Sequence, residues 1–344
     1  MSRRLFLWLT AAAVFLLTFR SSVAGDLLFF RPSRREKPRV PEDRFVSEGK
    51  ALVGVAGGSE PFEDRIRRAV DLIGGFERLN IRGRTVLVKP NVVSGNPSPT
   101  TTSPEVVAAV VRLLYAQGAR QVVVGDMSAL LSRATLENMQ RCGIRQAAEQ
   151  AGAKVVAFED FDWVEVPLPD GRYLKKALVS EWLYRVDIIV NLPVVKTHRS
   201  ASYTICLKNF IGCTHFRQRP YLVDRRHWEE LVAEFNLACR PDLNIVDATT
   251  TMIEGGPWEG TSAPTGLIIA SGDRVAADIV GLGLIRSFGR WQPVTEKGVW
   301  EQRQVQHALI LGLGRGRDGI TLRSTDGDAK FQELMSAVRR ETGL

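Results

Sequence analysis

Short apolar runs of strand length alternate with helix-like patterns along most of this chain, and no other feature constrains its fold as strongly. Residues 51–56, 85–88 and 121–124 are predicted to be strands, with helices at 61–73 and 104–117 between them. Strands separated by helices imply crossover connections between parallel strands. The sequence therefore predicts an α/β fold, a mainly parallel sheet with helices on both faces.

The second half of the chain continues this pattern and adds an insertion. A broken helix is expected between Ser132 and Ala151, and further elements are expected at 187–191, 243–246 and 266–270 as strands and at 227–239, 274–288, 299–311 and 329–339 as helices. Residues 154–158, 163–166 and 173–176 are predicted to be short strands, the last two on either side of a turn at Pro169-Asp170-Gly171. These short strands indicate a small inserted antiparallel segment.

The N-terminus has the pattern of a signal peptide. Arg3 and Arg4 precede an apolar run at residues 5–19, and Ser22-Val23-Ala24 offers a cleavage site, so residues 1–24 are interpreted as a signal. Ser2-Arg3-Arg4-Leu5-Phe6-Leu7 is similar to the twin-arginine export pattern. We expect a periplasmic or otherwise extracytoplasmic protein that meets the twin-arginine or the general secretion machinery. An uncleaved signal that anchors the chain is the alternative, although the run is short for a bilayer span.

Residues 25–49 contain Pro32, Pro38 and Pro41 among charged side chains and are predicted to form an extended tether. Residues 50–344 are then a single α/β domain, with two lobes as the alternative.

The formal charge of +8 does not indicate a nucleic-acid partner. Residues 1–44 hold nine Lys and Arg against four Asp and Glu, which leaves 37 against 34 in the rest of the chain. Proteins that bind phosphate backbones need a basic face rather than a basic tail. We therefore predict no binding of nucleic acid.

Four cysteines are spread along the chain as Cys142, Cys206, Cys213 and Cys239. They form no C-x-x-C pair, so the sequence contains no iron–sulfur motif. A disulfide between Cys206 and Cys213 is open in an oxidising compartment, whereas free buried thiols are expected for Cys142 and Cys239.

Basic and amide side chains gather where predicted strands end. Lys196-Thr197-His198 follows the strand at 187–191, Lys89-Pro90-Asn91 follows the strand at 85–88, and Lys208-Asn209 comes ten residues after His198. In open α/β sheets, ligands bind beyond the carboxyl ends of the strands. Ammonium and imidazole groups there form charge-assisted hydrogen bonds to carboxylates or phosphates. We expect Lys89, Asn91, Lys196, Thr197, Lys208 and Asn209 to bind a small anionic molecule, and His198 to be catalytic.

Two carboxylates also stand at predicted strand ends. Asp126 and Asp247 are candidate catalytic bases or ligands of a hard metal ion, with capping of a helix as the alternative. The turn Gly255-Gly256-Pro257 is expected to shape the pocket. Ser103 is expected to cap a helix beginning at Pro104, whose N-terminus would be a second place for an anion. Whether the site holds a metal ion or another cofactor stays open.

Several of these motifs together resemble one known family. The blocks in question are Val88-Lys89-Pro90-Asn91, Thr102-Ser103-Pro104-Glu105, Gly125-Asp126, Leu192-Pro193-Val194-Val195-Lys196-Thr197-His198, Leu207-Lys208-Asn209-Phe210-Ile211-Gly212, Gly255-Gly256-Pro257 and Ser271-Gly272-Asp273. In this order they resemble the family catalogued as domain of unknown function 362. The resemblance implies a fold and the place of a site but no reaction. It does not extend to the cysteine-rich ferredoxin module of many members, so it implies no iron–sulfur chemistry in this sequence.

Three functional hypotheses follow. The first is an exported enzyme acting on a small anionic substrate, motivated by the polar groups at strand ends. The second is a redox accessory or a metal- or cofactor-binding protein with a redox partner protein, motivated by the export pattern and the ferredoxin-bearing relatives. The third is a non-catalytic solute-binding module.

Overall fold

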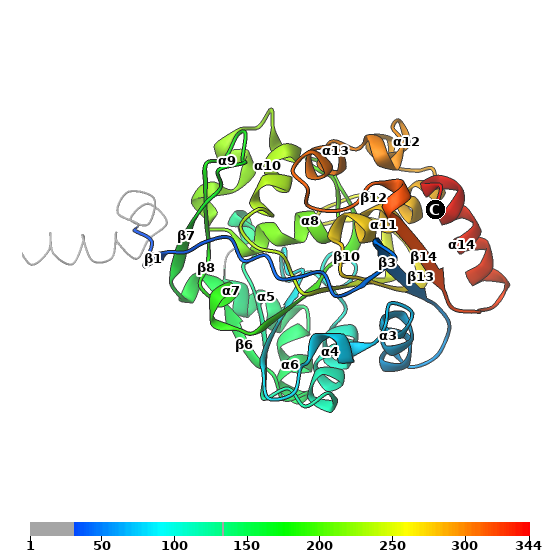
Figure 1. Cartoon of the computed structure of the whole chain (residues 1–344), viewed down its shortest axis with the longest axis horizontal. Coiled ribbons are helices and arrows are strands. Elements are labelled where there is room, and N and C mark those ends of the chain that lie inside the picture. Colours follow the sequence, from blue (N-terminus) through cyan, green and yellow to red (C-terminus); the bar gives the residue numbers. More distant parts are fainter. Residues whose placement is uncertain (1–30, 133) are drawn as a thin grey trace, which may run out of the picture.

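The computed structural model describes residues 31–132 and 134–344, and its centre is one large mixed sheet (Figure 1). In spatial order its main path consists of β14 (Ile320–Ser324), β3 (Lys50–Ala56), β13 (Gly260–Ser271), β12 (Leu243–Gly255), β9 (Ile188–Leu192), β4 (Thr85–Pro90), β5 (Gln121–Asp126) and β6 (Lys154–Ala157). Three shorter strands pair beside this path, namely β2 (Val46–Ser47), β10 (Val194–His198) and β11 (Ser202–Thr204).

The sheet is mainly parallel, as predicted. Strands β12, β9, β4, β5 and β6 run parallel to one another along this path, and β14 runs parallel to β3. The long hairpin of β12 and β13 supplies the antiparallel part. Because β4, β5 and β9 are parallel neighbours, their carboxyl ends lie at one edge of the sheet.

Helices cover both faces of the sheet, which confirms the predicted architecture. Val86 and Val88 of β4 belong to one core cluster together with residues of α3 (Phe62–Asp71), α4 (Pro104–Ala116) and α6 (Ile144–Gln150). Leu87, between the two valines, belongs to the other core cluster, with α8 (Cys206–Asn209), α10 (Trp228–Phe235) and α11 (Arg274–Ser287). This alternation is the period of two that a strand imposes on its side chains. In Figure 1 the first group of helices lies below the sheet and the second above it.

The remaining helices are peripheral. They are α5 (Thr135–Arg141), α7 (Trp182–Arg185), α9 (Pro220–Val223), α12 (Gln292–Thr295), α13 (Arg303–Ile310) and α14 (Ala329–Thr342). The helix expected at 299–311 is divided, because Gln302 has extended backbone angles between a 3-10 turn and α13. The helix expected at 227–239 is shorter and ends at Phe235.

A small separate sheet confirms the predicted antiparallel insertion and corrects its extent. Strands β7 (Trp163–Pro167) and β8 (Lys176–Ser180) are antiparallel, and β1 (Arg34–Arg35) adds to β7. The strand expected at 154–158 is not part of it, since β6 pairs with β5 in the main sheet.

The segment before β3 packs against the body instead of forming a free tether. Phe45 is completely buried and accepts a backbone hydrogen bond from Leu52, and Arg35 forms an ion pair with Glu165 of β7. The aromatic and charged side chains of this segment therefore have partners on the domain. The signal expected at residues 1–24, and residues 25–30, lie outside the described residues.

The hairpin of β12 and β13 is longer than predicted, because only the apolar runs at its base were expected to be strands. Its polar, β-branched run Thr249-Thr250-Thr251 continues the ladder beyond the core. At the tip, Gly255 and Gly256 have φ values of +90° and +78°. A Cβ on Gly256 would lie 2.1 Å from the carbonyl oxygen of Thr197, so the tip packs directly on β10.

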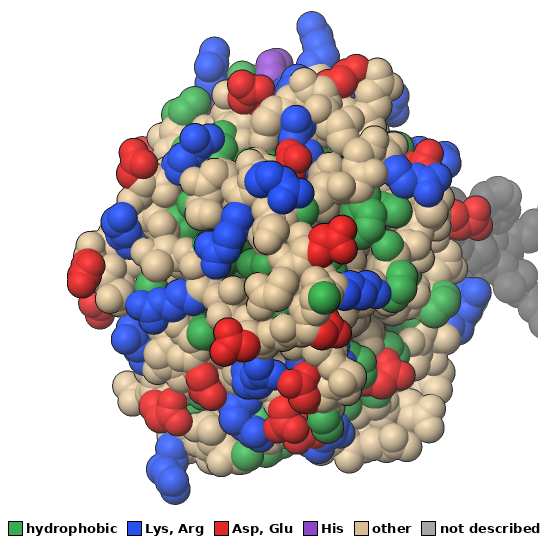
Figure 2. Space-filling model, turned by 90° about the vertical axis from the view of Figure 1, so that its right-hand side faces the viewer, with side chains coloured by type: hydrophobic (Ala, Val, Ile, Leu, Met, Phe, Trp, Pro, Cys, Tyr) green, Lys and Arg blue, Asp and Glu red, His purple; other side chains and the backbone are tan. Residues whose placement is uncertain are grey.

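The surface on the α14 side carries charges of both signs. Figure 2 shows Lys and Arg interspersed with Asp and Glu over this face. Among the described residues, no helix is long and apolar enough to cross a bilayer.

Candidate functional site

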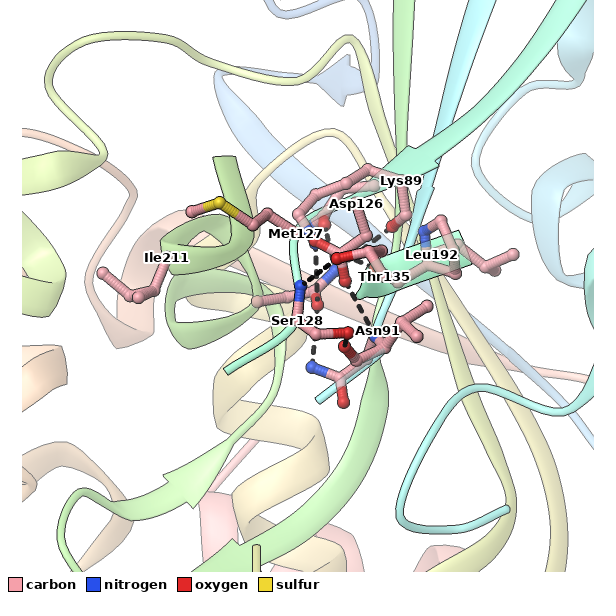
Figure 3. Close-up of polar contacts among 12 residues, drawn as sticks. Lys89, Asn91, Asp126, Met127, Ser128, Thr135, Leu192 and Ile211 are labelled. Carbon is pink, nitrogen blue, oxygen red and sulfur yellow. Dashed lines mark hydrogen bonds and ion pairs between the residues drawn. The ribbon is translucent and has the colours of Figure 1, made fainter. Parts of the chain in front are cut away.

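A buried ion pair joins the ends of β4 and β5. Lys89 Nζ lies 2.6 Å from Asp126 Oδ1, and both side chains are almost fully buried (Figure 3). The second carboxylate oxygen accepts a hydrogen bond from the backbone N–H of Val92 at 2.7 Å. The pair thus fixes the chain just after β4, where the candidate ligand-binding residues begin.

Asn209 connects α8 to this ion pair. Its Oδ1 accepts hydrogen bonds from Asn91 Nδ2 at 2.9 Å and from Lys89 Nζ at 3.3 Å. Its Nδ2 donates to Asn191 Oδ1 of β9 at 2.8 Å. The short helix that carries Lys208 is therefore held against the ends of β4 and β9.

Lys196 also holds Asn91 in place. Its ammonium group donates to Asn91 Oδ1 at 2.9 Å and to the carbonyl oxygen of Thr100 at 2.5 Å. Burial, together with the charge of Lys208, lowers the pKa of Lys196 well below its usual value. Lys196 therefore anchors the loop at 91–102 rather than reaching open space.

Asn91, Asp126 and Asn209 border a cavity of about 450 Å³. Its polar lining consists of Asn91, Asp126, His198, Ser200, Lys208, Asn209, Arg219, Tyr221 and Arg225. The apolar lining includes Met127, Leu130, Leu131, Ile211, Trp228 and Trp258. Leu131 and Trp258 are 86% and 39% exposed, which places them at the mouth. Five predicted site residues thus meet at one cavity, while Lys89 and Lys196 are absent from its lining.

Lys208 presents an unpaired ammonium group to the cavity. Among the described residues its Nζ has no hydrogen-bond or ion-pair partner, and it lies 5.6 Å from the centre of the Trp228 ring. Burial and the charges of Arg219 and Lys89 lower the pKa of Lys208 to about 7, although Asp126 opposes this shift.

His198 lines the cavity as a neutral imidazole. Its Nδ1 accepts hydrogen bonds from the backbone N–H groups of Ser200 at 3.1 Å and Ala201 at 3.2 Å. Burial and the charges of Lys208 and Lys196 lower its pKa well below the usual value. The proton is therefore on Nε2, for which the described part of the chain supplies no hydrogen-bond acceptor.

Arg219, which the sequence analysis did not single out, is a further cation of the lining. Its terminal nitrogens donate to the carbonyl oxygens of Ile211 at 2.7 Å and Met127 at 3.2 Å. Its Nε is buried and finds no partner within residues 31–132 and 134–344. It stands between two short helical turns outside every motif block, so only its charge could have suggested it.

Asp247 lies away from the cavity and binds backbone N–H groups through both of its carboxylate oxygens. Its Oδ2 accepts from the backbone N–H of Ser103, the residue preceding α4, and its Oδ1 accepts from Thr249. Burial raises the pKa of this carboxyl group. The side chain of Ser103 makes no capping bond, contrary to expectation. Asp247 therefore holds the backbone at the residue that precedes α4 and does not face the cavity.

Three other predicted residues are also absent from the lining. Thr197 is buried on β10, and the structure's described residues offer its hydroxyl no partner. Gly255 and Gly256 form the hairpin tip, where Pro257 rather than the glycines reaches the cavity.

Two residues that the sequence analysis gave no role support α8 and the ion pair. Asp278 of α11 accepts from the first backbone amides of α8, at Cys206 and Leu207. Burial raises the pKa of Asp278 to about 7. A Cβ on Gly212 would lie 2.0 Å from Asp126 Oδ1, so this glycine allows the backbone to cover the ion pair.

The described residues contain no cluster of three or more His, Cys, Asp or Glu side chains suited to a metal ion. All four cysteines are free and buried, so Cys206 and Cys213 do not form a disulfide.

Comparison with known proteins identifies the family. A model of the family described as Domain of unknown function (DUF362) matches residues 86–283. The chain belongs to this family. DUF362 membership confirms the resemblance that the motif blocks indicated, and it assigns no reaction.

Two further similarities accompany the DUF362 match. The chain is 29% identical over 223 residues to the thylakoid-associated protein sll1697 of Synechocystis sp., which covers 62% of this chain and 67% of that protein. It is also similar to the lactate racemase apoprotein from Thermoanaerobacterium thermosaccharolyticum, at 12% identity and a TM-score of 0.35, over 87% of this chain and 88% of that one. Similarity this distant says nothing about activity.

Proposed function

We propose that this protein is an exported enzyme that binds a small anionic molecule in the cavity beside Lys208. The main support is the charge balance of the lining. Lys208, Arg219 and Arg225 are cationic or can become so, whereas the carboxylate of the lining, Asp126, is paired with Lys89. Cationic groups that have no carboxylate partner among the described residues favour an anion in a partly enclosed space of lowered dielectric.

The lining also suggests how such a ligand would be held. Lys208 and Arg219 would bind its anionic group, and Asn91 and Asn209, whose positions are fixed by Lys196 and Lys89, would orient it. Trp228, Met127 and Trp258 would contact an apolar part of the same molecule. His198, with its proton on Nε2, is positioned to transfer a proton to or from the ligand.

Export is proposed on the twin-arginine-like pattern at Ser2 to Leu7, with the secretion machinery as the partner. The relative from Synechocystis is named for its association with thylakoids. That name is compatible with the proposal that this chain, too, acts next to a membrane.

A thermal-shift screen tests the binding part of this proposal. We expect phosphates, sulfate or carboxylates to stabilise the mature protein, by about 2.7 kcal/mol when the ligand is at 100 times its Kd. Lys208→Met should weaken the binding of the active anion by about ten- to a hundredfold, because a charge-assisted hydrogen bond is lost. Lys330→Met, on the exposed surface of α14, is the matched control.

Equal responses in Lys208→Met and in the unmodified protein would show that the cavity is not the binding site. Turnover of a ligand found in this way would establish an enzyme, whereas binding without turnover would favour the solute-binding hypothesis.

A further inference from the structure

Lys208 differs from the other two lysines of the site in its bonding. Lys89 is paired with Asp126, and Lys196 donates hydrogen bonds to Asn91, Thr100 and Pro257. Lys208 contacts the face of Trp228 instead, and no carboxylate among the described residues lies within ion-pair distance of it. Its amine is therefore available to a ligand without first breaking a protein contact.

The backbone that carries Lys208 is held firmly on both sides. Asp278 binds the first amides of α8, and Asn209 ties the next residue to Asn91 and Asn191. Lys208 is thus attached to a fixed part of the cavity wall. A fixed attachment point favours reaction at one defined position in the cavity.

The surroundings favour the uncharged form of this amine. Arg219 is buried nearby, and the aromatic ring of Trp228 replaces water on one side. With a pKa of about 7, a large part of the Lys208 population carries a free lone pair at neutral pH. An exposed lysine, with a pKa near 10.4, has almost none.

We propose that Lys208 is a nucleophile that forms an imine with the carbonyl carbon of an anionic aldehyde or ketone bound in the cavity. This rests on the proposed function for the anion site. In a carbonyl compound, Arg219 and Arg225 would keep the anionic group, and Lys208 would exchange its contact with that group for the carbonyl carbon. The proposal narrows the substrate class from anions in general to anionic carbonyl compounds.

The reaction balances without a further reactant. The Lys208 lone pair forms a C–N bond as the C=O π electrons move to oxygen, and transfer of one proton from nitrogen to oxygen gives a neutral carbinolamine. The nitrogen lone pair then forms C=N as the hydroxyl group leaves with a second proton as water. The imidazole of His198, with Nε2 protonated and facing the same cavity, is placed to pass these protons.

Pyridoxal 5′-phosphate, an anionic aromatic aldehyde, is a suitable probe, with pyridoxine 5′-phosphate as the analogue that lacks the carbonyl group. After brief incubation and reduction with borohydride, peptide mass spectrometry should locate the adduct at Lys208. We expect Lys208 to be modified at least about tenfold faster than exposed lysines such as Lys330, because more of it is unprotonated. Lys208→Arg should keep the binding of pyridoxine 5′-phosphate, because the positive charge remains, and should lose the adduct.

The outcomes separate the two proposals. If pyridoxine 5′-phosphate binds but Lys208 is modified no faster than Lys330, the imine proposal is wrong and the anion site stands. If neither probe binds, both proposals fail. A selective adduct at Lys208 that is lost in Lys208→Arg and retained in Lys330→Met supports both.

Discussion

Replacement of Asp126 by alanine is expected to lower the free energy of unfolding by about 3–5 kcal/mol, the usual cost of leaving a buried charge without its partner. Lys89 and Asp126 are 1% and 3% exposed, and they lie 2.6 Å apart. Without the carboxylate, the partners left to the Lys89 ammonium group among residues 31–132 and 134–344 are the carbonyl oxygen of Pro90 and Asn209 Oδ1. Urea denaturation measures the loss.

A double-mutant cycle distinguishes this mechanism from general damage to the core. Asp126→Ala combined with Lys89→Met should be clearly more stable than the sum of the two single changes predicts, since no unpaired charge remains. The exposed pair Arg145 and Glu149 on α6 provides the control, and Glu149→Ala should cost only about 0.5 kcal/mol. Additive effects at Asp126 and Lys89 would contradict the role given to the ion pair.

Replacement of Lys208 by methionine is expected to stabilise the protein, and more so at acidic pH. The pKa of Lys208 is about 7 in the folded state and near 10.5 in the unfolded state. Between these values the unfolded chain binds more protons, so stability rises with pH and the full penalty is present below pH 7. We expect Lys208→Met to raise the free energy of unfolding by about 2 kcal/mol at pH 6. This is less than the full pKa shift implies, because the side chain is partly exposed. The gain should nearly vanish at pH 10.

Thermal or urea unfolding at several pH values checks this difference between the two proteins. Lys330→Met should change stability by no more than about 0.5 kcal/mol throughout. A Lys208→Met variant that is less stable at pH 6, or equally altered at all pH values, would show that this ammonium group is not disfavoured in the fold. A residue that lowers stability and yet faces a cavity is the pattern expected of a functional group.

The fold was largely predictable because its signals are local. The valine-rich runs at 85–88 and 121–124 and Pro104 at the start of α4 lie within single elements. The same holds for Asp273, whose carboxylate caps α11 directly after it in the sequence. Each depends on residues a few positions apart, which periodicity and helix-start preferences capture.

The parts that were missed depend on contacts between distant residues. Asp247 accepts a hydrogen bond from the backbone of Ser103, 144 positions away, and Arg35 pairs with Glu165, 130 positions away. Phe45 likewise becomes buried only because the folded domain offers it a place. No local pattern distinguishes such residues from a free carboxylate or a solvated tether.

The candidate site shows the same limit. Strand ends identified the cluster, but sequence could not tell which lysine faces the cavity. Lys89 and Lys196 are buried and do not line the cavity, whereas Lys208, which looks equivalent in sequence, lines it and has no partner in the described part of the chain. The distinction arises from the asparagines at 91 and 209 and from Asp278, which together orient α8.

Anomalous diffraction from crystals soaked in sodium bromide tests the central claim most directly, because it locates a bound anion without knowledge of the natural ligand. At a pH below 7, where Lys208 is largely protonated, we expect a bromide ion in the cavity in contact with Nζ of Lys208 on the side of Arg219. It should be absent from crystals of Lys208→Met and present in those of Lys330→Met. Bromide ions that occupy other surfaces while the cavity stays empty, or a cavity ion unchanged in Lys208→Met, would contradict an anion site at Lys208.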